Sequence, residues 1–116
     1  MNMNVESRDH VARVAKALSD PNRLEMLEVM AHGRSCCGLP DAASRGVPGA
    51  EEPDGICVCE FQEQFGLAQS KVSYHLGVLK DAGLMKTETR GKWSFYTVDR
   101  DAVRAALEAF RALLKA

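Results

Sequence analysis

The chain has no long apolar run. None of its 116 residues lies in a hydrophobic stretch of the length that a membrane-spanning helix needs, so neither a transmembrane helix nor a membrane partner is expected. Residues 1–7 also lack the basic segment followed by an apolar one that marks a signal peptide. We therefore expect a cytoplasmic protein, whose four cysteines remain reduced and indicate metal or redox chemistry before structural disulfides.

The chain also lacks a large net charge. Its formal charge at pH 7 is −1, so the overall electrostatics does not indicate a nucleic-acid partner. The charges are unevenly distributed, however: residues 66–98 carry five basic and two acidic side chains, whereas residues 41–55 carry one basic and four acidic ones. This contrast indicates an anionic partner at one surface only.

The length and the hydrophobic spacing predict one domain, residues 1–116, that begins with two helices. The first covers about residues 7–18, and the second covers about residues 20–32 with Asp20 as its N-cap. Residues 34–55 then change character, because glycine, proline, serine, alanine and acidic residues dominate. We expect a long mobile loop there, of a length that in compact domains is usually functional or disordered.

A helix-turn-helix and a hairpin follow this loop. The apolar spacing predicts a short helix over 58–65 and a longer one over 69–82, joined by a short turn that contains glycine. Two β-prone runs, 84–90 and 93–98, then predict a hairpin. A last helix, capped by Asp99, has an apolar stripe composed of Val103, Leu107, Phe110 and Leu114. This order is typical of a mainly α fold with a β-hairpin wing (α+β), the winged helix-turn-helix.

The longer helix of this motif is expected to face DNA. The second helix of a helix-turn-helix enters the major groove and reads base edges with its first turns. Hydrogen-bonding side chains are expected on that face, namely Gln69, Ser70, Lys71, Ser73 and Tyr74. His75 lies beside the stripe of Val72, Leu76 and Leu79 that is expected to be buried, so a structural role and a phosphate contact carry equal weight. At the hairpin tip, Arg90 and Lys92 would reach phosphates or a minor groove. The alternative is an amphipathic helix whose polar face is only solvated, but the order and spacing of these features favour DNA.

Several segments resemble the ArsR family of metal-responsive repressors. The matching segments are Ala17–Leu24 at the beginning of the second helix, Cys57–Phe61 in the metal-binding box, Ser70–Leu76 and Leu79–Leu84 in the recognition helix, and Arg90–Trp93 with Tyr96 in the wing. The resemblance implies a homodimer whose first and last helices pair across a two-fold axis. It also implies that this dimer occupies double-stranded operator DNA until a metal ion releases it.

Three features of the sequence depart from the family pattern. Arsenic-sensing members often carry a third cysteine three residues after the Cys-Val-Cys pair, where this chain has Gln62. Members that sense zinc through the last helix carry acid and histidine pairs there, whereas this last helix has no histidine. The usual serine at the start of the recognition helix is Ala68, a poor N-cap. The first two departures concern the ligands of the ion, and the third weakens a helix boundary without changing the fold.

Cys57 and Cys59 are the first candidates for ion ligands. Within a regular helix they could not face one ion, but they can if Cys57 precedes the helix in extended backbone. Their position at a helix N-terminus is expected to favour the thiolate, which is the form that binds soft metals. Trivalent arsenic and antimony prefer three sulfurs, so we expect Cys36 or Cys37 to fold back as the third ligand. Closing that loop costs only about 0.6 kcal/mol per doubling of its length.

This ligand set favours arsenite, As(III), as the inducer, or antimonite, Sb(III). If Cys36 and Cys37 both bind, four sulfurs would suit Cd(II), Pb(II) or Zn(II) instead. A rival in the same class is a redox regulator, in which one of these two cysteines forms a disulfide with Cys57 or Cys59. A thiol enzyme is disfavoured, because no cysteine precedes a phosphate-cradling loop with arginine. A further alternative is a metal-buffering protein, which would not show the DNA affinity, falling steeply with salt, that is expected of a repressor.

Overall fold

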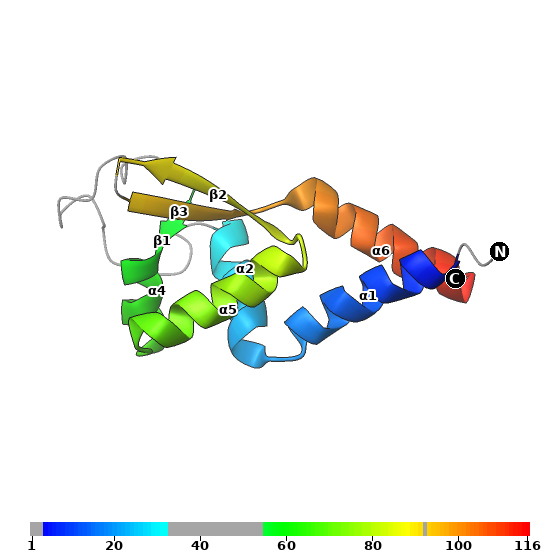
Figure 1. Ribbon diagram of the computed structural model, residues 1–116, viewed down its shortest axis with the longest axis horizontal. Helices are drawn as coiled ribbons and strands as arrows, with labels where there is room; N and C mark the ends of the chain where they lie inside the picture. The colour runs from blue at the N-terminus through cyan, green and yellow to red at the C-terminus, as the bar shows by residue number, and fades with distance from the viewer. Residues whose placement is uncertain (1–3, 33–54, 92) are drawn as a thin grey trace.

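The computed structural model describes residues 4–32, 55–91 and 93–116, so most of the predicted 34–55 loop lies outside the described residues. The described residues form five helices and three strands (Figure 1). In chain order these are α1 (Asn4–Leu18), α2 (Pro21–His32), β1 (Ile56–Cys57), α4 (Val58–Phe65), α5 (Gln69–Asp81), β2 (Met85–Arg90), β3 (Trp93–Val98) and α6 (Arg100–Leu114). None of these helices combines the length and the apolar character needed to cross a bilayer. The predicted mainly α fold with a β-hairpin wing is confirmed.

The ends of the helices follow from local side-chain chemistry. Asp20 and Asp99 each accept a hydrogen bond from a backbone N–H in the first turn of α2 and α6, at 2.8 Å and 3.1 Å. Gly66 ends α4 at φ 65° and ψ 30°, in the left-handed region that glycine adopts without strain. The predicted beginnings of α2 and α6 and the predicted end of α4 are therefore confirmed. α1 begins at Asn4, earlier than predicted, and Glu6 in its first turn favours this extension through the helix dipole.

β1 is an element that the sequence did not predict. Ile56 pairs with Tyr96 and Cys57 pairs with Phe95, which adds β1 to the hairpin and gives an antiparallel sheet in the order β1-β3-β2. A strand of two residues is too short to show the alternation by which strands are recognised. Its formation depends on contacts with β3, far along the chain. β1 thereby joins the beginning of α4 to the wing.

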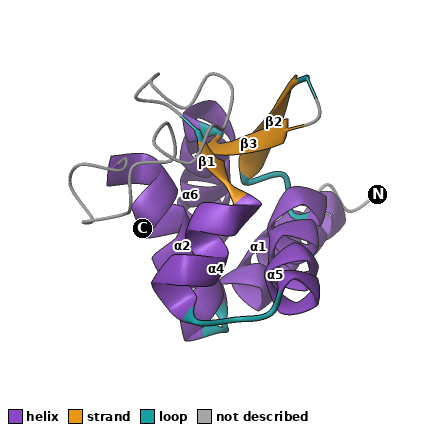
Figure 2. Cartoon of the chain, turned by 90° about the vertical axis from the view of Figure 1, so that its left-hand side faces the viewer, coloured by secondary structure: helices purple, strands orange, loops and turns teal. Residues whose placement is uncertain are grey.

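The core lies between the sheet and the helices α2, α4 and α5 (Figure 2). Each of these layers contributes completely buried side chains, among them Met26, Phe61, Val72, Leu79 and Phe95. The buried face of α2 consists of Arg23, Met26, Val29 and Met30. Leu24, an apolar residue of the same helix, is instead 53% exposed. α2 therefore presents a second apolar side away from the core.

Gly55, which precedes β1, packs directly against the wing. Its φ is +93°, and an added Cβ would lie 2.9 Å from the Cβ of Phe95. We expect Gly55→Ala to lower the free energy of unfolding by about 1–3 kcal/mol, because it combines backbone strain with a steric overlap. Urea titration measures this change. Gly77→Ala is the matched control, since Gly77 lies within α5 and an added Cβ there meets nothing within 4 Å. It should be neutral or stabilising by up to about 1 kcal/mol, and equal losses in both variants would contradict the packing described.

α1 and α6 lie side by side at one end of the molecule, away from the wing (Figure 1). α1 begins and α6 ends at this end. The molecule is consequently elongated, with a longest dimension of 54 Å against 25 and 24 Å in the other two directions. The two helices contribute Val14, Ala17 and Ala106 to the core, and their far ends extend beyond it.

Candidate functional site

α5 carries the side chains that were predicted to meet DNA. Five exposed polar residues line its outer face, namely Gln69, Ser70, Lys71, Ser73 and Tyr74. The apolar residues between and after them are buried, namely Val72, Leu76 and Leu79. The helix therefore has one side fixed in the core and one side available to a partner.

α4 is the helix that supports α5. The two helices pack against each other, and Phe61 and Phe65 of α4 stack with their ring centroids 6.2 Å apart. α5 begins after Ala68, which makes no side-chain capping hydrogen bond, as expected of alanine at this position. The start of α5 consequently depends on its packing against α4, and a displacement of α4 would reach the outer face of α5.

The wing is described except at its tip. β2 and β3 pair along their whole length, from Met85 opposite Val98 to Arg90 opposite Trp93. Arg90 thus ends β2 next to the turn, where a basic residue was expected. Lys92 lies outside the described residues, and its phosphate contact stays a prediction.

His75 is turned into the protein. Only 7% of it is exposed, and its Nδ1 lies 3.1 Å from Nη1 of Arg23 in α2. Of the two roles weighed for His75, this geometry fits the structural one, because a buried ring already bonded to Arg23 does not project toward a phosphate. Arg23 itself was missed. It lies inside the predicted second helix, and nothing in the local spacing indicates that a charged side chain there is buried.

Cys57 and Cys59 converge at the beginning of α4. Cys57 is the N-cap, at φ −89° and ψ 164°, and so lies in extended backbone just before the helix. Its Sγ is 2.6 Å from the Sγ of Cys59, in a contact in which either thiol can donate. The expectation that extended backbone brings the two sulfurs together is confirmed. Cys57 is buried and Cys59 is partly buried.

Glu60 stabilises the junction between β1 and α4. Its Oε1 accepts a hydrogen bond from the backbone N–H of Cys57 at 3.0 Å, while its own N–H points back at the Cys57 side chain. This is a reciprocal capping box, and Glu60 is completely buried within it. Sequence reasoning gave Glu60 no role, although a glutamate three residues after an N-cap is the usual signal. The cysteine in place of the usual serine or threonine obscured it.

The thiol of Cys57 keeps its proton in the ion-free protein. Burial raises the pKa of Cys57 to about 12, and its hydrogen bond with Cys59 and the charge of Glu60 act in the same direction. The backbone N–H of Glu60 lowers this pKa, as expected at a helix N-terminus, but it has the smaller effect. The expectation that this position favours the thiolate is therefore wrong for Cys57, because desolvation outweighs the helix terminus. An ion bound there must displace the proton.

The described residues supply two sulfurs for an ion. Within 4–32, 55–91 and 93–116, no group of three histidine, cysteine, aspartate or glutamate side chains is arranged to hold a metal. Cys36 and Cys37, the predicted sources of a third sulfur, lie outside these ranges. Their participation stays a prediction.

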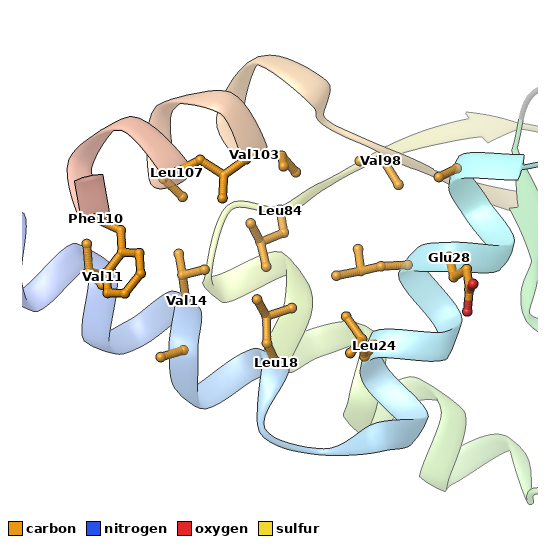
Figure 3. A pocket seen from close by; sticks show the side chains of 14 residues that line it. Val11, Val14, Leu18, Leu24, Glu28, Leu84, Val98, Val103, Leu107 and Phe110 are labelled. Carbon is orange, nitrogen blue, oxygen red and sulfur yellow. The ribbon is translucent and has the colours of Figure 1, made fainter. Parts of the chain in front are cut away.

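A large apolar groove lies where α1, α2 and α6 meet (Figure 3). Its volume is about 750 Å³. Its hydrophobic walls include Val11, Val14, Leu18, Leu24, Leu27, Val103, Leu107 and Phe110. An open groove with walls this apolar is a candidate contact surface.

The apolar stripe of α6 forms one edge of the groove and is largely uncovered. Leu107, Phe110 and Leu114 are 63%, 52% and 64% exposed, whereas Val103 is packed against the core. Contiguous exposed apolar residues of this kind mark an interaction surface. The stripe thus does little for the core of one chain and is available to a partner.

Comparison with known proteins relates these features to one family. A family model described as "Bacterial regulatory protein, arsR family" matches residues 52–87, from just before β1 into β2. The arsenical resistance operon repressor of Bacillus subtilis (strain 168) is 37% identical over 93 residues, which cover 79% of this chain and 69% of that protein. A cadmium resistance transcriptional regulatory protein CadC homolog of Staphylococcus aureus is 28% identical over 98 residues, covering 84% and 64% respectively.

A solved structure has the same fold. It is the homodimeric winged helix-turn-helix DNA-binding domain of a Mycobacterium bovis protein, to which this chain is similar with a TM-score of 0.67. The match covers 97% of this chain and 86% of that one at 22% sequence identity. The fold class predicted from the sequence is confirmed by this similarity.

Proposed function

Because this chain belongs to the ArsR family of bacterial regulatory proteins and is a transcriptional regulator, not an enzyme, we propose that it represses transcription as a DNA-bound homodimer and leaves its operator when trivalent arsenic binds. The observation that carries the proposal is the contact between the Cys57 and Cys59 sulfurs, 2.6 Å apart, at the first turn of the helix that supports α5. One ion held there would act on both the reading helix and the wing.

The outer face of α5 would read the operator. Gln69, Ser70 and Ser73 can bond to base edges, while Lys71 would neutralise a phosphate. Arg90 and Lys92 would add phosphate contacts at the wing. Support for this assignment comes from the exposure of these polar side chains on a helix whose other side is buried.

Lys71→Gln is expected to weaken binding to every duplex by a similar factor, because a phosphate contact carries no sequence information. The slope of log affinity against log salt concentration should fall by about one. Lys115→Gln is the matched control, since it removes the same charge at the far end of α6 and should change neither quantity. Fluorescence anisotropy at several salt concentrations measures both, and an unchanged slope for Lys71→Gln would remove this residue from the interface.

The apolar groove where α1, α2 and α6 meet would be filled by a second copy of the chain. The uncovered stripe of Leu107, Phe110 and Leu114 supplies the hydrophobic surface that such an interface needs. A two-fold dimer would place two α5 helices on one face of a duplex, about 34 Å apart, which is one turn of the double helix. Dimerisation thus accounts for a surface that one chain leaves exposed.

Cys57 and Cys59 would hold the ion, with Cys36 or Cys37 as the third ligand. The chemistry fits, because thiolates are soft ligands and trivalent arsenic prefers three of them. The proton of Cys57 leaves as the ion binds, so a group that is inert in the free protein becomes a ligand. The arsenical resistance repressor among the relatives supports arsenic as the inducer.

Release of DNA would follow from the position of Cys57 in two elements at once. It is the last residue of β1, which pairs with β3 of the wing, and it is the N-cap of α4, which packs against α5. An ion that draws Cys57 toward a third sulfur would shift the wing and the reading helix together. By linkage, the ion must then bind less tightly to the DNA-bound protein.

A cadmium, lead or zinc repressor is the second candidate, supported by the similarity to a cadmium resistance regulator. It would use both Cys36 and Cys37, giving four sulfurs. Titrating the reduced protein–duplex complex with arsenite, antimonite, Cd(II), Pb(II), Zn(II) and peroxide separates these possibilities. Release by arsenite at the lowest concentration is the expected result. Release by peroxide without an ion would favour a thiol–disulfide regulator, and retention under every condition would overturn ion sensing.

A further inference from the structure

The guanidinium of Arg23 joins three parts of the protein. Its Nε donates to the carbonyl oxygen of Ala17 at 2.7 Å, and its Nη2 donates to that of Lys16 at 3.3 Å, both at the end of α1. Nη1 lies 3.1 Å from His75 Nδ1 of α5 and 3.8 Å from Asp20 Oδ2. Arg23 is itself only 8% exposed. One side chain of α2 thus connects α1 to the helix that carries the DNA-facing residues.

The Arg23–His75 hydrogen bond has only one possible direction. Arginine donates and never accepts, so His75 Nδ1 must accept and must carry no proton. His75 is therefore neutral in this arrangement, with its proton on Nε2. Because both groups are buried, loss of the acceptor would leave Nη1 of a charged donor without its hydrogen bond, which is costly.

Packing by the apolar side of α5 does not by itself fix the angle of the helix. Val72, Leu76 and Leu79 bury hydrophobic surface, and that effect has no preferred direction. A charge-assisted hydrogen bond is directional and short. His75 follows Tyr74 directly, and their rings are 5.4 Å apart, so a rotation of His75 about the axis of α5 carries Tyr74 with it.

We infer that Arg23 is a positioning residue for DNA binding, which acts through His75 to set the rotation of α5 against α1 and α2. The inference rests on the proposed DNA-binding function of α5. Arg23 does not touch DNA in this role. It determines where the outer face of α5, with Lys71 and Tyr74, points relative to α1 and α2.

Two variants test this role. His75→Asn retains an acceptor that cannot be protonated, and His75→Leu removes the acceptor while keeping a side chain of similar size. The probe is the duplex that the wild-type protein selects from a randomised library of about 30 base pairs, which accommodates two half-sites one turn apart. The affinity for this duplex is measured at neutral pH for the wild-type protein and for both variants.

We expect His75→Asn to bind within about threefold of the wild-type protein, because its amide oxygen still accepts from Arg23. His75→Leu should bind about tenfold or more weakly while still unfolding cooperatively. If His75→Leu does not fold, the NMR measurement of the imidazole described below still decides.

Equal losses of affinity in His75→Asn and His75→Leu, or no loss in His75→Leu, would overturn the positioning role. A wild-type protein that selects no duplex would instead overturn the proposed DNA-binding function, and this inference with it. The two failures are distinguishable, because only the first leaves a measurable wild-type complex. Nitrogen NMR of the imidazole gives an independent readout, and a proton found on Nδ1 at neutral pH would contradict the hydrogen bond.

Discussion

With Cys57 or Cys59 replaced by serine, the repressor will stay on its operator in the presence of arsenite. Each substitution removes one of the two sulfurs that meet at the start of α4, and a serine oxygen is a poor ligand for a soft ion. The wild-type affinity for DNA should fall at least about tenfold on ion binding, which corresponds to about 1.4 kcal/mol of coupling. In either serine variant the change should be less than about twofold.

The Cys57→Ser variant removes an ion ligand without disturbing the fold. Serine is a favoured N-cap, and serine at position 57 with Glu60 three residues later makes the usual capping box. Cys57→Ser should therefore keep α4 and bind DNA normally without an ion. The matched controls are Cys36→Ser and Cys37→Ser, singly and together. Loss of the response in one single variant identifies the third ligand, whereas a normal arsenite response in Cys57→Ser would show that the ion binds elsewhere.

The second large effect is expected at the apolar stripe of α6. Leu107→Glu or Phe110→Glu places a carboxylate in the surface that we assign to the dimer, and burying an unpaired charge costs several kcal/mol. The two-fold axis places the substitution in the interface twice. We expect the dimer to dissociate at concentrations about a hundredfold or more above those that dissociate the wild type. DNA affinity should fall with it, because a monomer reaches one half-site.

Sedimentation analysis of each variant measures the dimer directly. Ala105→Glu is the matched control, because residue 105 is exposed and lies on the opposite side of α6 from Leu107. It adds the same charge to the same helix and should leave the dimer intact. Dissociation of all three variants to the same extent would show that any added charge on α6 weakens the dimer, and that the apolar stripe has no specific role in it. A dimer that persists in Leu107→Glu and Phe110→Glu would show that the groove has another occupant.

The features that the sequence predicted are those that depend on neighbouring residues. Asp20, Asp99 and Gly66 determine helix ends through bonds or backbone angles within one turn, so their roles could be recognised without a structure. The approach of Cys57 and Cys59 was predictable for the same reason, because extended backbone places alternate residues on one side. The apolar spacing of the helices likewise predicted which side of α5 is buried.

The features that the sequence did not predict depend on contacts between distant segments. β1 exists because Cys57 and Phe95 pair across about forty residues, and two residues have no recognisable pattern. The burial of Arg23 depends on His75, which lies 52 positions away. The pKa of Cys57 was misjudged because the helix terminus is a local feature, whereas the burial that outweighs it is a property of the folded chain.

The most direct test of ion-driven release is to measure the affinity for arsenite twice, once with free protein and once with protein saturated by operator duplex. Linkage requires that an ion that weakens DNA binding is itself bound more weakly by the DNA-bound protein, by the same factor. We predict an affinity at least about tenfold lower in the complex. Equal affinities in the two states would contradict release by the ion, even if Cys57 and Cys59 bind it.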